Sequence, residues 1–333
     1  MARKNYPALS VIMPVLNEEG HLADAVDSVL AQNYPGEIEL LLALGPSRDD
    51  TNKIAAKVAK ADKRVRLIDN PRGLTTVGLN EAIRQTRYDY IVRVDAHSEP
   101  AANYLTRGIE ILLQTGADLL GGIMAARGRS AFQKAVAWAY TSRFGVGGAA
   151  YHVGGNAAEA ESAYLGIFRK SALERVGGYN EGIIRGEDWD LAQRIKHTGG
   201  LVWFSPELEV TYWPRGRFSR LVKQFYSTGV WRGELTRRNF ASASKRYFAP
   251  PLTLLVIAIG LAVLCFGHVL GLLPLAAYLL GVAFLAVTAP RLSLKSRVAV
   301  LVVLPTMHFS WGAGFWVGLI RGANMRTVDR SRV

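Results

Sequence analysis

Two short stretches of the sequence bring together side chains that could carry out chemistry. At residues 92–100, VRVDAHSEP, an apolar run ends in Asp95, Ala96 and His97. One carboxylate and one imidazole can hold a divalent ion whose remaining positions are filled by phosphate oxygens and water. Such an ion would neutralise the charge that develops on a departing diphosphate. Taken alone, an Asp-x-His pair is more often two ordinary polar residues at the end of a strand.

The second stretch, GEDWDLAQR, gathers Glu187, Asp188 and Asp190 just before a run with helical spacing. This pattern places carboxylates at the beginning of a helix, where they complement the positive end of the helix dipole. That structural role accounts for one or two of the three acids. A carboxylate that faces a pocket from this position can act as general base on an acceptor hydroxyl.

Alternating strand and helix patterns position these residues. Short apolar runs predict strands over 9–15, 38–44, 64–69 and 90–94, and amphipathic segments predict helices over 21–32, 51–61 and 75–86. This alternation indicates βαβ units and an α/β fold with a mostly parallel sheet. Ligands bind beyond the carboxyl ends of the strands in such sheets. Asp95 and His97 follow the fourth strand at such an end.

Composition restricts the class of protein less than the motifs do. The 333 residues are half apolar, and 40 Lys+Arg against 27 Asp+Glu leave a formal charge of +13. A basic chain suits nucleic acid, an anionic membrane surface or a polyanionic substrate. The single cysteine, Cys265, lies in an apolar run, so an intrachain disulfide is excluded.

The last third of the sequence predicts membrane helices. Residues 248–290 contain no Asp, Glu, Lys or Arg, which fits two spans joined near Gly267 and His268. A further uncharged run, 298–320, contains Pro305 and is either a third span or a re-entrant segment. A buried helical core is the alternative for all of these runs. We divide this region into 248–320, with two or three spans, and a basic tail, 321–333.

A basic amphipathic segment, 214–247, precedes the first span. Its nine Lys and Arg residues face one acid, Glu234, and Phe218, Leu221 and Phe225 fall at helical spacing among them. A helix of this kind next to a span is typical of an interfacial anchor on anionic membrane lipids. Nucleic acid is the competing partner, and we expect none, because juxtamembrane basic clusters already have a partner in lipid.

The motifs, taken in order, resemble a known family. PVLNEE, PSRDDT, VDAH and GEDWDLAQR are arranged as in the inverting family 2 glycosyltransferases, which have a GT-A (Rossmann-like) fold. YLGIFRKSALERVGGYNEG and YWPRGRFSRLVKQFYSTGVWR are similar to the bacterial exopolysaccharide branch that includes succinoglycan-type membrane glucosyltransferases. The resemblance implies a catalytic domain over 1–213 on the cytoplasmic face of a multi-pass protein of the cell inner (plasma) membrane.

The resemblance also implies roles for individual residues. Donor-binding residues would be Pro14, Val15, Asn17, Glu18, Gly45, Ser47, Arg72, Asp95 and Ala96. Asp95 and His97 would hold Mn²⁺ or Mg²⁺, and Asp188 would take the position of the catalytic base. Possible acceptor or diphosphate contacts are Glu187, Trp189, Gln224 and Arg232. Leu44 or Gly45 stands at the place where relatives carry an Asp that reads uracil, although the family still favours UDP.

The expected activity is transfer of a sugar from a nucleotide-diphosphate sugar, favoured as a UDP-sugar, to a hydroxyl of a lipid-linked saccharide. The acceptor would be carried on polyprenyl diphosphate. One alternative is a polyprenyl-phosphate glycosyl synthase, in which the lipid phosphate itself is the acceptor and needs no general base. The other alternative is a non-catalytic membrane scaffold with the same fold.

Overall fold

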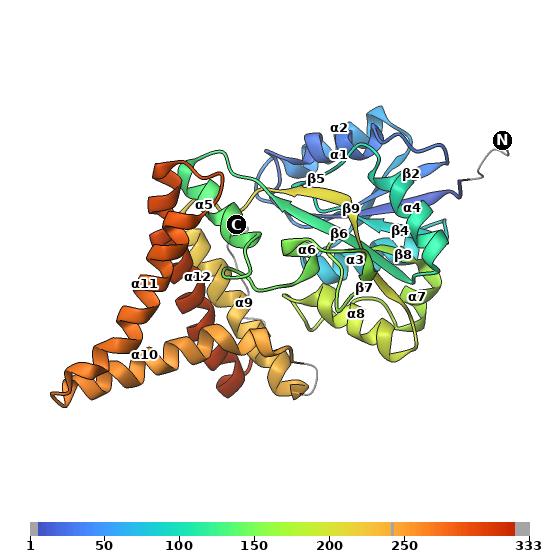
Figure 1. Cartoon of the computed structure of the whole chain (residues 1–333). Helices are drawn as coiled ribbons and strands as arrows, with labels where there is room; N and C mark the ends of the chain where they lie inside the picture. Colours follow the sequence, from blue (N-terminus) through green and yellow to red (C-terminus); the bar gives the residue numbers. More distant parts are fainter. Residues whose placement is uncertain (1–5, 241–242, 324–333) are drawn as a thin grey trace. The chain divides into compact units, whose positions relative to one another are not determined.

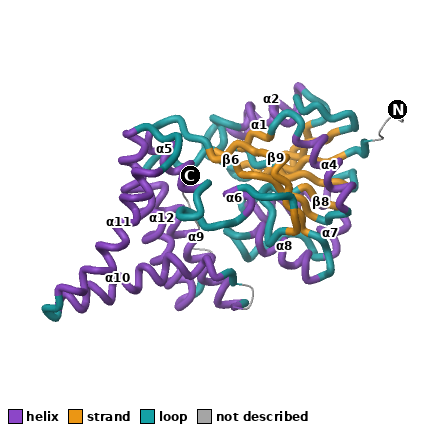
Figure 2. The backbone as a smooth tube through the Cα atoms, viewed as in Figure 1, coloured by secondary structure: helices purple, strands orange, loops and turns teal. Residues whose placement is uncertain are grey.

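The computed structural model describes residues 6–240 and 243–323. The chain divides into two compact units (Figure 1). Among the described residues, the first unit, here called the sheet unit, comprises 6–125 and 149–212, and the second, the helix unit, comprises 126–148, 213–240 and 243–323. Among the described residues the strands belong to the sheet unit, and the helix unit is built of helices and their connections (Figure 2).

The sheet unit contains a mixed sheet. Its strands are β1 (Leu9–Val15), β2 (Ile38–Leu44), β3 (Val65–Asp69), β4 (Tyr90–Arg93), β5 (Ser98–Pro100), β6 (Leu119–Ala126), β7 (Ala158–Glu159), β8 (Ile167–Arg169) and β9 (Val202–Tyr212). They are ordered β3-β2-β1-β4-β8-β6-β9-β5, and β7 pairs with β9. The first four strands are parallel, as predicted, and the pairs β4–β8, β6–β8, β5–β9 and β7–β9 are antiparallel.

Helices cover both faces of this sheet. They are α1 (Leu22–Leu30), α2 (Thr51–Ala61), α3 (Thr75–Gln85), α4 (Tyr104–Thr115), α6 (Ala150–Val153), α7 (Lys170–Arg175) and α8 (Glu187–His197). Apolar residues of α1, α2 and α4 join one buried cluster, and those of α3, α7 and α8 join the other. The three predicted helices are confirmed, because amphipathic periodicity buries one stripe of each against the sheet.

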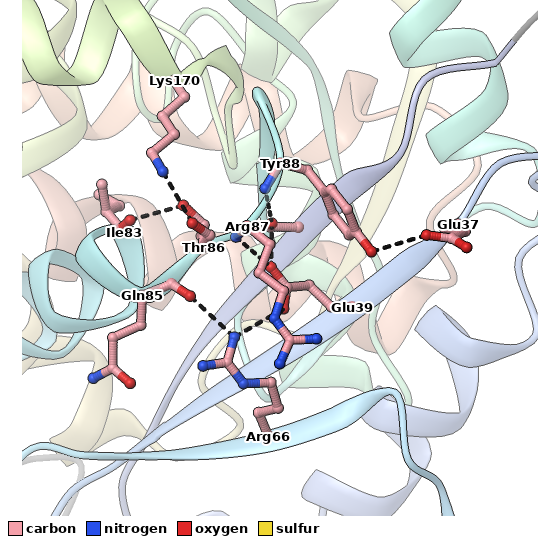
Figure 3. A network of polar contacts seen from close by, with 10 residues as sticks. Glu37, Glu39, Arg66, Ile83, Gln85, Thr86, Arg87, Tyr88 and Lys170 are labelled. Atoms are coloured by element: carbon pink, nitrogen blue, oxygen red, sulfur yellow. Dashed lines mark hydrogen bonds and ion pairs between the residues drawn. The ribbon is translucent and has the colours of Figure 1, made fainter.

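A polar network braces the amino ends of the parallel strands (Figure 3). The Glu39 carboxylate on β2 is buried and accepts hydrogen bonds from Ser10 Oγ at 2.7 Å, from the Arg87 backbone N–H at 2.7 Å and from Arg66 at 2.9 Å. Burial alone would raise the pKa of Glu39, but these hydrogen bonds lower it overall. The ionised Glu39 carboxylate therefore holds β2 to β3 through Arg66 and to the turn before β4 through Arg87.

Within its described residues, the helix unit contains three helices that are long and apolar enough to cross a membrane. Its elements are α5 (Ala131–Tyr140), α9 (Phe218–Arg238), the 3-10 turn η2 (Lys245–Phe248), α10 (Ala249–Cys265), the 3-10 turn η3 (Val269–Leu272), α11 (Leu273–Thr288) and α12 (Leu294–Arg321). The candidate spans are Lys245–Cys265, Val269–Thr288 and Leu294–Arg321. The turn expected near Gly267 and His268 lies between the first two. Pro305 lies inside α12 and does not end it.

Helix α9 packs closely along α12 through glycines. A Cβ added at Gly229 or Gly233 would meet α12 backbone oxygens at 2.2 Å, and one added at Gly318 would meet the Val230 carbonyl oxygen at 1.9 Å. Small residues four apart allow backbones to approach this closely. Leu221 and Phe225, which we expected to face lipid, are buried within this unit, whereas Phe218 is exposed. The interfacial role of 214–247 stays a prediction, and most of the predicted tail, 324–333, lies outside the described residues.

Candidate active site

The candidate site lies at the carboxyl ends of β1, β2 and β4. Pro14 and Val15 end β1, Gly45 follows β2, and Asp95 and Ala96 follow β4. The Gly45 N–H donates to the Val15 carbonyl at 2.8 Å, so the loops after β1 and β2 begin side by side. The parallel register therefore brings residues distant in sequence to one edge of the sheet, as the strand order requires.

Hydrogen bonds to side chains connect the loop after β1 with the loop after β2. The Asn17 N–H donates to Ser47 Oγ at 3.1 Å, and Asn17 Oδ1 accepts from the Arg48 N–H at 2.8 Å. The Glu18 N–H donates to Thr51 Oγ1 at 2.7 Å. Asn17 has a φ of 54°, a left-handed conformation that Asn tolerates better than most residues and that recurs at ligand-binding sites. Predicted donor-binding residues from two loops thus form one connected group.

His97 is oriented by a carboxylate. Its Nδ1 lies 3.0 Å from Glu18 Oε1, and its side chain is 24% exposed. A metal-binding imidazole commonly donates one ring N–H to a carboxylate, which directs the other nitrogen at the metal. The Glu18–His97 pair, with Asp95 two residues away, therefore fits a divalent cation. No three His, Cys, Asp or Glu side chains in the described ranges are grouped closely enough to hold a metal by themselves, so donor oxygens would have to complete the set.

Arg93, which the sequence analysis did not single out, joins the two predicted motifs. Its guanidinium Nε lies 3.0 Å from Asp95 Oδ1, one terminal nitrogen lies 2.5 Å from Asp188 Oδ1, and the other lies 3.4 Å from Glu187 Oε1. The Arg93 side chain is 3% exposed. The predicted metal motif on β4 and the predicted base on α8 are therefore parts of one buried cluster.

The environment of Asp188 suits a general base. Burial, followed by the neighbouring charges of Glu187 and Asp95, raises its pKa from 3.8 to about 7, and Arg93 opposes this rise. A base is most effective when its pKa lies near the operating pH. The Asp188 side chain is still 28% exposed, so a substrate hydroxyl can reach it.

The other residues of the acidic motif have structural partners. Asp190 pairs with Arg194 one turn along α8 at 2.8 Å, which is the dipole-complementing role expected for part of the motif. Trp189 donates from Nε1 to Glu161 Oε1 at 2.9 Å. Trp189 thus ties α8 to the segment before β8, a contact across 28 residues that spacing could not reveal.

Three further predicted residues lie in the loop after β3 and in α9. Arg72 forms an ion pair with Glu181 at 2.6 Å, and both side chains are partly exposed. Gln224 and Arg232 belong to α9 in the helix unit, where the Arg232 guanidinium lies 4.2 Å from the centre of the Tyr247 ring.

The cluster carries an excess of negative charge. Glu18, Asp95, Glu187 and Asp188 supply four carboxyl groups, and the Arg93 guanidinium balances at most one of them. A diphosphate would be repelled from such a site unless a cation came with it. The charge balance therefore supports a divalent ion as part of the donor complex.

Comparisons with known proteins agree with this geometry. A family model described as glycosyl transferase family 2 matches residues 10–177. The succinoglycan biosynthesis protein ExoA of Rhizobium meliloti (strain 1021) is 31% identical over 315 residues, covering 93% of this chain and 94% of that protein. A dolichyl N-acetyl-α-D-glucosaminyl phosphate 3-β-D-2,3-diacetamido-2,3-dideoxy-β-D-glucuronosyltransferase of Methanococcus voltae is 21% identical over 327 residues, covering 94% of this chain and 98% of the relative.

A solved structure shares the fold. The mannosyltransferase PcManGT from Pyrobaculum calidifontis, in complex with GDP-Man and Mn²⁺, superimposes with a TM-score of 0.66 at 19% sequence identity. The match covers 96% of this chain and 89% of that one. The predicted GT-A fold, followed by apolar helices, is confirmed.

Proposed function

Because the chain belongs to glycosyltransferase family 2, we propose that it is a metal-dependent inverting enzyme whose general base is Asp188. The sugar would move from a nucleotide-diphosphate sugar to a hydroxyl of a lipid-linked saccharide. The observation that carries the proposal is the Asp188 carboxylate, which contacts the same Arg93 guanidinium as Asp95 at the carboxyl ends of the parallel strands.

Asp188 would take the proton of the acceptor hydroxyl as that oxygen attacks the anomeric carbon opposite the diphosphate. Direct displacement inverts the anomeric configuration and needs no covalent intermediate. Asp95 and His97 would hold Mn²⁺ or Mg²⁺, which supplies charge neutralisation to the departing diphosphate. Glu18 orients the His97 ring for that purpose.

UDP is favoured as the nucleotide by the family resemblance. Leu44 ends β2 and Gly45 follows it, so neither position offers a carboxylate to a base N–H. PcManGT was solved with GDP-Man, which makes GDP the second nucleotide to examine. Thermal unfolding of detergent-purified protein with UDP or GDP, each with and without Mn²⁺, separates the two. A ligand at 100 times its dissociation constant adds about 2.7 kcal/mol of stability.

A membrane location supports a lipid-linked acceptor. The candidate spans follow the catalytic domain and helix α9, and the M. voltae relative is named for a dolichyl phosphate-linked sugar substrate. Arg291 in the connection between α11 and α12, with Lys295 and Arg297 at the beginning of α12, favours the cytoplasmic side for that connection. The proposal therefore places the catalytic domain on the cytoplasmic face of the plasma membrane, next to polyprenyl-diphosphate-linked saccharide.

Replacement of Asp188 tests the base directly. Asp188→Asn keeps the shape and removes the proton acceptor, so transfer to a saccharide hydroxyl should fall by about a hundredfold or more. Asp190→Asn on the same helix is the matched control and should retain activity, because Asp190 pairs with Arg194. A loss below about tenfold for Asp188→Asn would favour transfer to a lipid phosphate, which needs no base. Unchanged polymer formation without both Asp95 and Asp188 would favour a scaffold.

A further inference from the structure

The β4 strand explains why Arg93 lies inside the protein. Ile91 and Arg93 point to the same face of the sheet, because side chains alternate along a strand. Ile91 packs in the apolar cluster that contains Leu191 of α8. Arg93 is thereby directed at the beginning of α8, where Glu187 and Asp188 lie. A charged residue is placed on the buried face of a central strand, and its partners come from a different element.

The three nitrogens of the Arg93 guanidinium contact three different carboxylates. Nε contacts Asp95, and the two terminal nitrogens contact Asp188 and Glu187 respectively. The Arg93 guanidinium carbon also lies 5.8 Å from the centre of the buried Tyr179 ring. A planar fork can satisfy three directions at once, whereas a lysine ammonium is a point charge on a flexible stem. The contacts require arginine specifically rather than any cation.

We infer that Arg93 is a positioning residue, which fixes Asp188 relative to Asp95 through one buried guanidinium. The inference rests on the proposed function, because it concerns the same two carboxylates. Asp95 belongs to the connection after β4 and Asp188 to α8, and 93 residues separate them in the chain. Donor and acceptor must be aligned closely for displacement, and a misplacement of about 1 Å can reduce the rate a hundredfold.

The charge balance gives this role a distinctive signature. Arg93 contacts Asp95 at 3.0 Å and so offsets part of the negative charge that would attract a metal ion. A variant without the guanidinium should bind Mn²⁺ at least as tightly as the natural protein, although its turnover falls. Loss of fold would weaken both properties together, so the two readouts distinguish positioning from structural damage.

The experiment compares Arg93→Lys and Arg93→Met with Arg66→Lys in the full-length, detergent-purified protein. Arg66 is the matched control, because it pairs with the buried Glu39 on the same sheet at its amino edge. Mn²⁺ binding is followed by electron paramagnetic resonance, and transfer is followed from UDP-glucose and from GDP-mannose into the lipid fraction. We expect both Arg93 variants to lose about a hundredfold in kcat with donor KM changed less than about threefold. Arg66→Lys should change neither.

A double variant isolates the route of the effect. If Arg93 acts through Asp188, Arg93→Lys should change the rate of Asp188→Asn less than about twofold, because residues that act as a unit are not additive. Weaker Mn²⁺ binding in Arg93→Lys, an unchanged kcat, or full additivity with Asp188→Asn would overturn the inference. If Asp188→Asn itself retains activity, the proposed base is wrong. If Asp188→Asn is inactive and Arg93→Lys is fully active, only the positioning role is wrong.

Discussion

The proposed role of Asp188 as general base, together with its raised pKa, predicts that the rate of transfer depends on pH in a defined direction. The carboxylate must be ionised to accept a proton, and with a pKa of about 7 it is about 9% ionised at pH 6 and about 91% at pH 8. The value of kcat/KM should therefore rise about tenfold across this interval, and it reports the free enzyme. Initial rates of nucleotide release from pH 5.5 to 9, at fixed Mn²⁺ and low donor concentration, measure this rise.

A neighbouring carboxylate provides the test of the cause. Glu187 raises the pKa of Asp188, so Glu187→Gln should move the midpoint of the profile to lower pH. A rate independent of pH between 6 and 8, or a midpoint that moves upward in Glu187→Gln, would refute the assignment.

The raised pKa of Asp188 also makes the stability of the folded protein depend on pH. The folded state retains a proton that the unfolded state releases, so the stabilising contribution of Asp188 is present below pH 3.8 and is lost as pH rises through about 7.

Three further predictions concern the framework around the site. Gly318→Val should lower the thermal midpoint in detergent by a few degrees, equivalent to about 1–3 kcal/mol, because its Cβ would lie 1.9 Å from the Val230 carbonyl oxygen. Gly281→Val on α11, where a Cβ meets nothing within 4 Å, is the control, and equal midpoints would contradict the packing argument. Glu39→Gln should cost about 2 kcal/mol in chemical denaturation at pH 7. Because the pKa of Glu39 is lowered, this difference should be present above its ordinary value of 4.5 and disappear as pH falls below it, whereas Glu37→Gln should have little effect at any pH. In a Cys265→Ser background, His268→Cys in the α10–α11 turn should react with an impermeant maleimide added to spheroplasts, and Lys57→Cys on α2 should react only after permeabilisation. Labelling of both before permeabilisation would contradict the proposed topology.

Local patterns were sufficient for the parallel half of the sheet and for the apolar helices that could span a membrane. The runs at 9–15 and 38–44 coincide with β1 and β2, and the uncharged run 248–290 contains α10 and α11. These elements follow from periodicity and hydropathy within one segment. The antiparallel strands β8 and β9 could not be assigned to the sheet in this way, because their pairing depends on partners tens of residues away.

The packing of α9 shows how a correct local pattern can leave the partner undetermined. Leu221 and Phe225 form an apolar face at helical spacing. Such a face can pack equally well against a lipid surface or against another helix. The glycines 229 and 233 on α9 and 314 and 318 on α12 carry the information that separates the two. Glycines spaced by four in a segment next to a membrane indicate close helix contact. They were visible in the sequence, and they account for the burial of this face against protein.

Arg93 shows why the candidate site could be recognised only in part from sequence motifs. Asp95 and Asp188 stand out in sequence because each belongs to a polar motif at the end of an element. Arg93 lies inside a run, YIVRV, that reads as a strand, so its charge looks like an outward-facing residue. A parallel strand covered by helices on both faces has no solvent side, however, and any charge on it must find carboxylates within the protein. The prediction of a parallel sheet therefore already implied that the Arg93 guanidinium is paired. Asp95 lies two residues away, and the acidic motif with Glu187 and Asp188 begins a helix that covers the sheet. The pairing of Arg93 with these carboxylates is therefore the physical link between the two motifs.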